Sequence, residues 1–412
     1  MERPVMAGGF GPLAGMKVVE LAHIMAGPVC GMMLADMGAD VVKVEKPEGD
    51  DTRRFLPPDI EGESAAFMMM NRNKRGVVLD LKSDDGRAAL RRMLETADVV
   101  IENYRMGTME KLGLGYEELR KVNPGLIYCE ISGFGRTGPY AARGGFDLIA
   151  QGMSGLMSIT GEGPGRPPVK SGAPVSDITA GILGALGCVA AYTRKLQTGE
   201  GQKVDTSLFE AGITHTYWQS AIAFATGTPP GPLGSAHPLN APYQAFRTSD
   251  GWINLGAANQ KNFERMLSVI GAEELASDER FATNRDRMSN LAALEAILND
   301  HFVTDSSAAW LERLEAAGVP AGPVLDICEM HQDPQAIARE MIVATTHPVA
   351  GEVKAIGLPI KFSETPGKVE RPAPLLGEHS REVLAEAGFS ADEIAGMIES
   401  GAVRAARGRP RP

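Results

Sequence analysis

The chain of 412 residues is poor in cysteine, histidine and aromatic residues. Its four cysteines, Cys30, Cys129, Cys188 and Cys328, form no CxxC pair, and all of them stand in apolar segments. This spacing argues against a disulfide framework and against a zinc site. We therefore expect reduced, buried thiols and a reducing compartment.

Basic residues are also scarce, because 41 Lys and Arg against 52 Asp and Glu give a formal net charge of -11. Nucleic-acid binders need a basic face, so nucleic acid is not an expected partner. No stretch approaches about 20 uninterrupted apolar residues, and the opening MERPVMAGGFGPLAG lacks the basic patch and apolar core of a secretion signal. We expect a cytoplasmic protein that does not span a membrane.

What is present is an alternation of apolar β-branched runs with helix-like segments, which is typical of parallel strands joined by crossover helices. The expected strands are 16–22, 40–45, 76–81, 98–103, 126–132 and 203–208. The expected helices between them are 27–38, 83–97 with Ser83 as its cap, and one from about Ser176 to Leu196. This pattern predicts an α/β fold with a doubly wound, Rossmann-like large domain.

The domain organisation follows from composition. We expect a large domain over 1–225, a Gly- and Pro-rich linker over 226–242, and a smaller α/β domain over 243–345 that is rich in helix-forming sequence. The segment 346–412 should return to the large domain and end in a helix and a basic tail, RAARGRPRP, which we expect to be a frayed, solvated end.

The sequence GFGRTG at 133–138 matches the glycine pattern of dinucleotide-binding proteins and follows an expected strand. Pro139 comes next, however, and no apolar-periodic helix opens there to receive a pyrophosphate. A turn is the favoured interpretation, and a nucleotide-binding or NAD-linked protein stays as an alternative.

Polar residues collect directly after the expected strands, at the edge where doubly wound sheets bind ligands. They include His23, Lys46, the group Asn103, Tyr104 and Arg105, and Gly133 with Phe134; the run NRNKR at 71–75 adds further cations. Such a set suits a phosphorylated ligand, because cations pair with phosphate and aromatic rings can cover a base. The alternative is that these cations are merely solvated and that His23 is structural.

The chain also resembles the class III CoA transferases, a family that includes formyl-CoA transferase, carnitine CoA transferase and α-methylacyl-CoA racemase. The resemblance covers nearly the whole chain. It is carried by LAGMKVVELAHIMAGP (13–28), GADVVKVEKPEGDDTR (38–53), NRNKRGVVLDLK (71–82), DVVIENYRMGTMEKLGLGYEEL (98–119), NPGLIYCEISGFGRTGP (123–139), the segment 176–208 that begins SDITAG, and APLLGEHSREVL (373–384).

The resemblance implies a CoA-transferring enzyme that works as an interlocked homodimer and holds no tight cofactor, with acyl-CoA and carboxylic acids as substrates. The implied CoA contacts are His23, Lys46, Asn71, Arg72, Asn73, Lys74, Arg75, Asn103, Tyr104, Arg105 and Lys111. The implied nucleophile is Asp177, which would form a mixed anhydride and then an aspartyl-CoA thioester. Its place at a helix start independently favours a charged carboxylate, although an ordinary capping Asp is the alternative.

The positions at which this chain differs from individual family members narrow the range of expected substrates. The family's racemases need a histidine where this chain has Phe146 and an acid where it has Asn259, so racemase activity is only an alternative. Formyl-CoA and oxalate are doubtful because Met25 replaces a glutamine and LGSAHPLNAPY replaces a glycine-rich loop. The sequence of this segment resembles that of enzymes that move CoA between dicarboxylates, for example from succinyl-CoA to a C4 to C5 acid. Candidate substrate contacts are Met25, Gly133, Phe134, His237 and Asn240.

Overall fold

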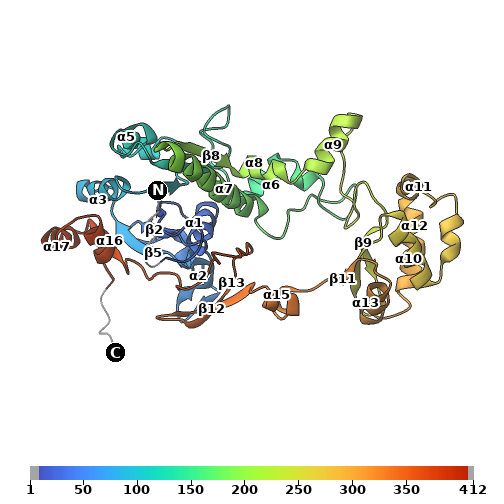
Figure 1. Ribbon diagram of the computed structural model, residues 1–412. Helices are drawn as coiled ribbons and strands as arrows, with labels where there is room; N and C mark the ends of the chain where they lie inside the picture. Colours follow the sequence, from blue (N-terminus) through green and yellow to red (C-terminus); the bar gives the residue numbers. More distant parts are fainter. Residues whose placement is uncertain (1–8, 407–412) are drawn as a thin grey trace. The chain divides into compact units, whose positions relative to one another are not determined.

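The computed structural model describes residues 9–406, and Figure 1 shows their path. The chain divides into two compact units. Unit 1 consists of 1–154, 172–215 and 334–412, and unit 2 consists of 155–171 and 216–333. This grouping assigns 155–171 and the helix after residue 216 to the smaller unit, whereas the sequence suggested a large domain that is continuous to residue 225.

A seven-stranded sheet forms the centre of unit 1, in the order β14-β5-β2-β1-β6-β7-β8. Its strands are β1 (Lys17–Glu20), β2 (Asp40–Glu45), β5 (Arg75–Leu79), β6 (Val99–Glu102), β7 (Ile127–Ser132), β8 (Lys203–Ser207) and β14 (Val403–Arg404). All neighbours are parallel except β14, which pairs antiparallel with β5. In chain order the six parallel strands run 3-2-1-4-5-6, the order of the Rossmann fold. The six strands expected from the sequence are confirmed.

The remaining strands of unit 1 form two short antiparallel pairs, β3 (Asp59–Ile60) with β4 (Glu63–Ser64) and β12 (Ile342–His347) with β13 (Gly351–Ile356). Its helices are α1 (Ala26–Asp36), η1 (Asp51–Arg54), α2 (Ala65–Asn71), α3 (Asp84–Leu94), α4 (Thr108–Lys111), α5 (Tyr116–Val122), α6 (Asp147–Met153), α7 (Val175–Thr198), α8 (Leu208–Thr214), α15 (Pro334–Ala338), α16 (Ser380–Glu386) and α17 (Ala391–Glu399).

Unit 2 has an antiparallel sheet in the order β11-β10-β9 and a set of helices. Its elements are η2 (Leu156–Ser158), α9 (Tyr217–Thr226), β9 (Tyr243–Arg247), β10 (Trp252–Gly256), α10 (Gln260–Ile270), η3 (Glu273–Ser277), α11 (Asn284–Ser289), α12 (Leu291–Phe302), α13 (Ser307–Ala316), β11 (Ala321–Pro323) and α14 (Ile327–Met330). Its core includes Phe246, Phe263, Phe302 and Trp310.

The two faces of the central sheet are buried by different helices, because successive strand residues point to opposite sides. Val18 packs with residues of α1, α7 and α8, whereas Val19 packs with residues of α3, α5, α16 and α17. Strands buried on both faces read as continuous apolar runs, which is why the sequence located them. The cap of α3 is also as expected, since Ser83 Oγ accepts from Gly86 N at 3.0 Å.

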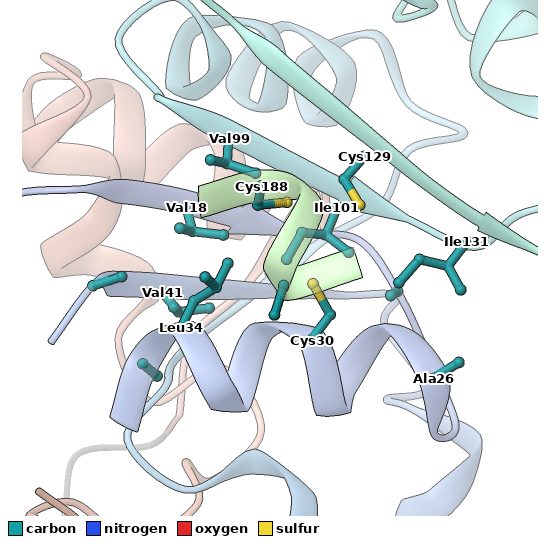
Figure 2. Close-up of a cluster of buried hydrophobic side chains, with 14 of the residues drawn as sticks. Val18, Ala26, Cys30, Leu34, Val41, Val99, Ile101, Cys129, Ile131 and Cys188 are labelled. Carbon is teal, nitrogen blue, oxygen red and sulfur yellow. The ribbon is translucent and has the colours of Figure 1, made fainter. Parts of the chain in front are cut away.

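Three of the four cysteines pack in this core. Figure 2 shows Cys30 on α1, Cys129 on β7 and Cys188 on α7 among aliphatic side chains. All three are buried, free thiols, as expected. Cys328 is also a free thiol, but the expectation that it is buried is wrong: it lies exposed in α14, outside the apolar core.

The helix α7 is the longest in the described chain, with 24 residues, and packs against α1, α8 and β7. A β-carbon at Gly181 would lie 2.6 Å from the carbonyl oxygen of Ala26, so glycine lets the starts of the two helices approach closely. By length and mean hydropathy α7 alone among the described helices could also cross a membrane. One face of this helix packs against the central sheet, while Ile182 and Leu186 on it are exposed.

Candidate active site

A cavity of about 510 Å³ lies at the carboxyl ends of the central strands of unit 1. It opens around the ends of β1, β6 and β7, which includes the switch point between β1 and β6 where ligands bind in sheets of this order. Among its lining residues are His23, Ile24, Met25, Asn103, Tyr104, Arg105, Gly133, Arg143, Phe146 and Asp177.

The loops after β1 and β6 are tied together across the switch point. His23 N donates to Asn103 Oδ1 at 3.0 Å, and Asn103 Nδ2 donates to the carbonyl of His23 at 2.8 Å. The rings of His23 and Tyr104 lie 6.0 Å apart. Burial lowers the pKa of His23, so this imidazole is neutral at pH 7. Its Nδ1 is buried and has no hydrogen-bond partner among residues 9–406.

A smaller cavity of about 110 Å³ adjoins the first, and His23, Asp51 and Tyr104 line both. Lys46, the residue after β2, lies on its wall and is half exposed, with its ammonium 2.9 Å from Asp51. A solvent-accessible lysine at this position can exchange its surface ion pair for a phosphate at little cost, since such pairs contribute little.

A buried ion network supports the loop that carries His23. Lys43 contacts Glu20 at 3.0 Å and Asp50 at 2.9 Å, and all three side chains are buried. Burial disfavours the charge on Lys43, but the two carboxylates outweigh it and hold its pKa above the usual range. Burial would likewise raise the pKa of Asp50, yet Lys43 and the amide of Thr52 hold it well below the usual range.

Asp50 also reaches the cavity wall, since its Oδ1 lies 3.4 Å from the amide of Ile24. Ile24 has φ 68, a left-handed conformation that is strained for a β-branched residue. Strain of this kind persists only where the surroundings fix the backbone. The buried network therefore holds the β1 loop in an unfavourable conformation at the cavity mouth.

Asp177 stands in the first turn of α7, half-buried on the cavity wall. Its carboxylate accepts no hydrogen bond from the described residues, and burial, followed by the nearby charge of Asp147, raises its pKa to about 6. An ionised carboxylate without hydrogen bonds keeps its lone pairs available for attack on a carbonyl carbon. The expected position of Asp177 at the beginning of a helix is confirmed.

The loop after β7 folds against itself. A β-carbon on Gly133 would lie 2.7 Å from Gly145 Cα, so both positions need glycine. GFGRTG is a turn, and no helix begins between Pro139 and α6, as the sequence indicated. Arg143 is exposed on the cavity wall, with its guanidinium 4.0 Å from the ring centre of Tyr140.

The structure therefore brings together His23, Met25, Asn103, Tyr104, Arg105, Gly133 and Asp177 in one cavity, with Lys46 in the adjoining one. Phe134 does not line it, because its buried ring packs against Tyr140 and Phe209. Lys111 is exposed on α4, outside the lining. The cation Arg136 does line the cavity, but it is engaged by Glu102 at 2.7 Å and Glu130 at 3.1 Å.

Residues 71–75 lie immediately before β5 and at its first residue, and none of them lines either cavity. Arg75 pairs with Asp40 at 2.6 Å and Glu382 at 2.8 Å. Lys74 is buried against Glu20 at 2.8 Å, and burial lowers its pKa to about 8. Both cations are engaged by carboxylates of unit 1, and a CoA contact at either of them stays a prediction.

The other three residues of this run are bound within unit 1 as well. Arg72 pairs with Asp36 at 2.7 Å, Asn73 Nδ2 donates to Asp36 at 2.7 Å, and buried Asn71 donates to the carbonyl of Phe67 at 2.9 Å. All five residues have structural contacts, and none lines either cavity.

His237 and Asn240 belong to unit 2, where His237 stacks on Tyr243 with ring centres 5.1 Å apart. Its Nδ1 accepts from Leu239 N at 3.1 Å. Asn259, which the resemblance aligns with an acid of the racemases, is the N-cap of α10 and accepts from Asn262 N at 2.9 Å. A part of His237 and Asn240 in substrate binding stays a prediction.

Sequence reasoning missed Asp147, Arg143, Asp51 and Ile24. The sequence did contain a signal for Asp147, because an Asp directly before an apolar helical segment is typical of a helix start. The sequence prediction named only its neighbour Phe146. Arg143 lies eleven positions beyond Ser132, the last residue of β7, in a loop whose sequence does not indicate where a side chain points. A left-handed Ile24 has no sequence signature.

Fold and site together define a Rossmann-type α/β protein with a ligand-sized cavity at the switch point and an unpaired carboxylate on its wall. The chain matches the model of CoA-transferase family III over residues 13–380. It is 44% identical over 382 residues to a succinate–glutarate CoA-transferase of Agrobacterium fabrum, which covers 91% of this chain and 95% of the relative.

Two further proteins are similar to this chain over most of its length. A succinyl-CoA:mesaconate CoA-transferase of Haloarcula hispanica is 40% identical and covers 92% of this chain and 97% of the relative. A crystal structure of a CAIB/BAIF family protein from Brucella suis is 43% identical with a TM-score of 0.82, covering 92% of this chain and 100% of that one. The chain belongs to CoA-transferase family III and is an enzyme that transfers CoA, with CoA thioesters as substrates; the resemblance is confirmed.

Proposed function

We propose that this enzyme transfers CoA from succinyl-CoA or a similar short dicarboxylyl-CoA to another dicarboxylate, with Asp177 as its nucleophile. The observation that carries the proposal is the half-buried carboxylate of Asp177, which accepts no hydrogen bond from the described residues and faces the cavity. The names of the Agrobacterium and Haloarcula relatives support dicarboxylates as the substrate class.

The proposed chemistry balances without a tightly bound cofactor. An oxygen of Asp177 attacks the thioester carbonyl, the carbon–sulfur bond breaks, and CoA leaves as thiolate, which gives a mixed anhydride. The thiolate then attacks the Asp177 carbonyl carbon and releases the donor acid, leaving an aspartyl-CoA thioester. The acceptor carboxylate repeats these two steps in reverse and leaves as its CoA thioester, so that Asp177 becomes a free carboxylate again.

CoA would lie along the two adjoining cavities. Lys46, Arg105 and Arg143 are exposed cations on their walls, and cations of this kind pair with phosphates. His23, Asn103 and Tyr104 form the floor between the phosphates and Asp177, while Lys111 is an outlying candidate. Met25 and Gly133 line the reaction end of the cavity, and the loop with His237 and Asn240 supplies candidate donors for the remote carboxylate.

We also propose a cytoplasmic homodimer. Buried free thiols suit a reducing cytoplasm. Large apolar side chains of α6 and α7 are exposed in the single chain, among them Leu148, Ile149, Ile182 and Leu186. A patch of this kind marks a protein interface, and a second copy would cover it. Sedimentation at micromolar concentration tests this, and a single monomeric species would contradict it.

The nucleophile is tested by intact-mass analysis after mixing the enzyme with succinyl-CoA and quenching. We expect an adduct on the peptide that contains Asp177 in the wild type and none in Asp177→Asn, which keeps the shape but is a far poorer nucleophile. Asp84→Asn is a matched control, because Asp84 lies in the first turn of α3 and is exposed. Full transfer by Asp177→Asn, with deamidation excluded, would overturn the assignment.

The substrate class is tested with acids of equal chain length. Glutarate should accept CoA, and valerate, which lacks the second carboxylate, should accept it poorly, because a site built for a charged group discriminates strongly against its absence. Equal rates with the two acids would show that the enzyme does not recognise dicarboxylates.

A further inference from the structure

Two carboxylates meet at the N-terminal end of α7, and they have opposite surroundings. Asp147, the first residue of α6, accepts from Ser176 N at 2.9 Å through Oδ1 and from Gln151 Nε2 at 2.7 Å through Oδ2. Gln151 is fully buried. Asp177, one residue after Ser176, accepts no hydrogen bond from the described residues.

Asp147 occupies the place of a missing helix cap. Pro174, the N-cap residue of α7, makes no side-chain cap hydrogen bond. The carboxylate of Asp147 takes over this role from a different helix and satisfies one of the free amides that every helix start exposes. Two hydrogen bonds hold this carboxylate at the positive end of the α7 dipole, where a negative charge is favourable.

We propose that Asp147 is a positioning residue for the transfer reaction. It caps α7 so that the first turn directs Asp177 to the cavity, and its fixed negative charge makes the free carboxylate of Asp177 more basic and more reactive. This inference rests on the proposed role of Asp177 as nucleophile.

Repulsion between the carboxylates of Asp147 and Asp177 should favour acylation of Asp177. While Asp177 is ionised, two negative charges lie close together at one helix end, and repulsion of this kind disfavours the charged form. Acylation of Asp177 removes its charge, whether in the anhydride or in the thioester. Asp147 therefore raises the energy of the free enzyme relative to both covalent intermediates and favours their formation.

The pKa of Asp177 reports this interaction. Burial raises it first and the charge of Asp147 second, to about 6. The other charged or titratable groups on the cavity wall and on the helices packed against the start of α7 are His23, Cys30, Asp51, Tyr104, Arg105, Arg136, Arg143, Glu210 and His215. Within residues 9–406, Asp147 is the one charged group that contributes to the raised pKa of Asp177, so it is the residue to vary.

The rate of transfer should depend on pH through the ionisation of Asp177. Asp177 attacks only when ionised, so transfer should fall as the pH drops through about 6 in the wild type. Asp147→Asn keeps an oxygen that can accept from Ser176 N but removes the charge. The pKa of Asp177 then moves down toward its ordinary value, and the acid limb of the pH–rate profile should move to lower pH.

The experiment compares Asp147→Asn with Asp98→Asn and Asp147→Glu. Asp98 accepts from Lys195 of α7 at 2.6 Å and from Lys17 N at 2.8 Å, so it is a matched carboxylate at the other end of the same helix. We expect Asp147→Asn to lower kcat about tenfold or more, with the KM for acyl-CoA changed less than about threefold. Its acid limb should shift down by about half a pH unit or more. Asp98→Asn should keep the wild-type profile, and Asp147→Glu should restore the limb.

Thermal melts of the variants separate misfolding from this effect, and the position of the pH limb can be measured on whatever active fraction remains. An acid limb that stays at the wild-type pH in Asp147→Asn, while covalent adducts still form on Asp177, would overturn the inference alone. Absence of any adduct in the wild type would instead remove the proposed function beneath it.

Discussion

The close approach of α1 to the buried ion network makes Gly31→Ala the most informative stability variant. A β-carbon at Gly31 would lie 1.9 Å from Glu20 Oε2 and 3.0 Å from its Cδ. Glu20 is fully buried and is held by Lys43 and Lys74. The carboxylate would have to recede by about 1.5 Å to reach ordinary contact distance, which breaks its 2.8 Å contact with Lys74.

The expected magnitude combines opposing terms. Alanine is favoured over glycine inside a helix by about 1 kcal/mol. Overpacking costs about 1–3 kcal/mol, and disruption of a buried ion pair costs about 3–5 kcal/mol because it leaves charges uncompensated. Gly31→Ala should therefore destabilise unit 1 by at least about 3 kcal/mol. Gly396→Ala in α17 is the matched control: this glycine is exposed and its β-carbon would meet nothing within 4 Å, so only the helix-forming gain of up to about 1 kcal/mol remains.

Urea unfolding at fixed protein concentration measures both variants. The three tryptophans, Trp218, Trp252 and Trp310, all belong to unit 2, so their fluorescence follows that unit. Far-UV circular dichroism follows both units, and loss of transfer activity follows the site. The far-UV midpoint should fall for Gly31→Ala and stay level or rise for Gly396→Ala. If Gly31→Ala is as stable as the control, Glu20 is not locked by its two lysines and the account of the network is wrong.

Two further predictions concern the site. Lys46→Ala should raise the KM for acyl-CoA several-fold with little change in kcat, because Lys46 lies on the cavity wall away from Asp177; Lys82→Ala, an exposed lysine after β5 outside both cavities, should change neither. An unchanged KM in Lys46→Ala would refute a phosphate contact at this position. The resemblance aligns Phe146 with the histidine of the racemases, so a 2-methylacyl-CoA incubated with the enzyme in deuterated water should stay unlabelled at the α-carbon. Rapid labelling, read by mass spectrometry, would favour the racemase alternative.

The sequence by itself determined the six parallel strands and the helix that carries Asp177. Strands β5 and β6 are buried on both faces, and the residues 77–79 and 99–101 within them read as short apolar runs. The edge at which His23 and Asn103 meet was predictable too, because residues that follow parallel strands share one side of the sheet whatever the strand order. The ordered family motifs added the activity and singled out Asp177.

Only the tertiary structure decided what each cation does. The sequence predicts NRNKR as part of the ligand site because its charges and its motif are visible in the sequence, whereas the partners of these side chains are not. Arg75 finds Glu382 and Glu386, more than 300 positions away, and Lys74 finds Glu20. Long-range pairing depends on strand order and on which side of β5 the run enters, and neither is encoded locally.

The contact between Asp147 and α7 has the same origin. It joins residues separated by 29 positions through a loop, and nothing in the spacing of GGFDLIAQ and PVSDITAG indicates that the two helix starts meet. Hydrogen bonding and charge act over a few ångströms in space. In the mechanism that we propose, the packing of α6 against α7 therefore sets the reactivity of Asp177, whereas the sequence alone already singled this residue out as the candidate nucleophile.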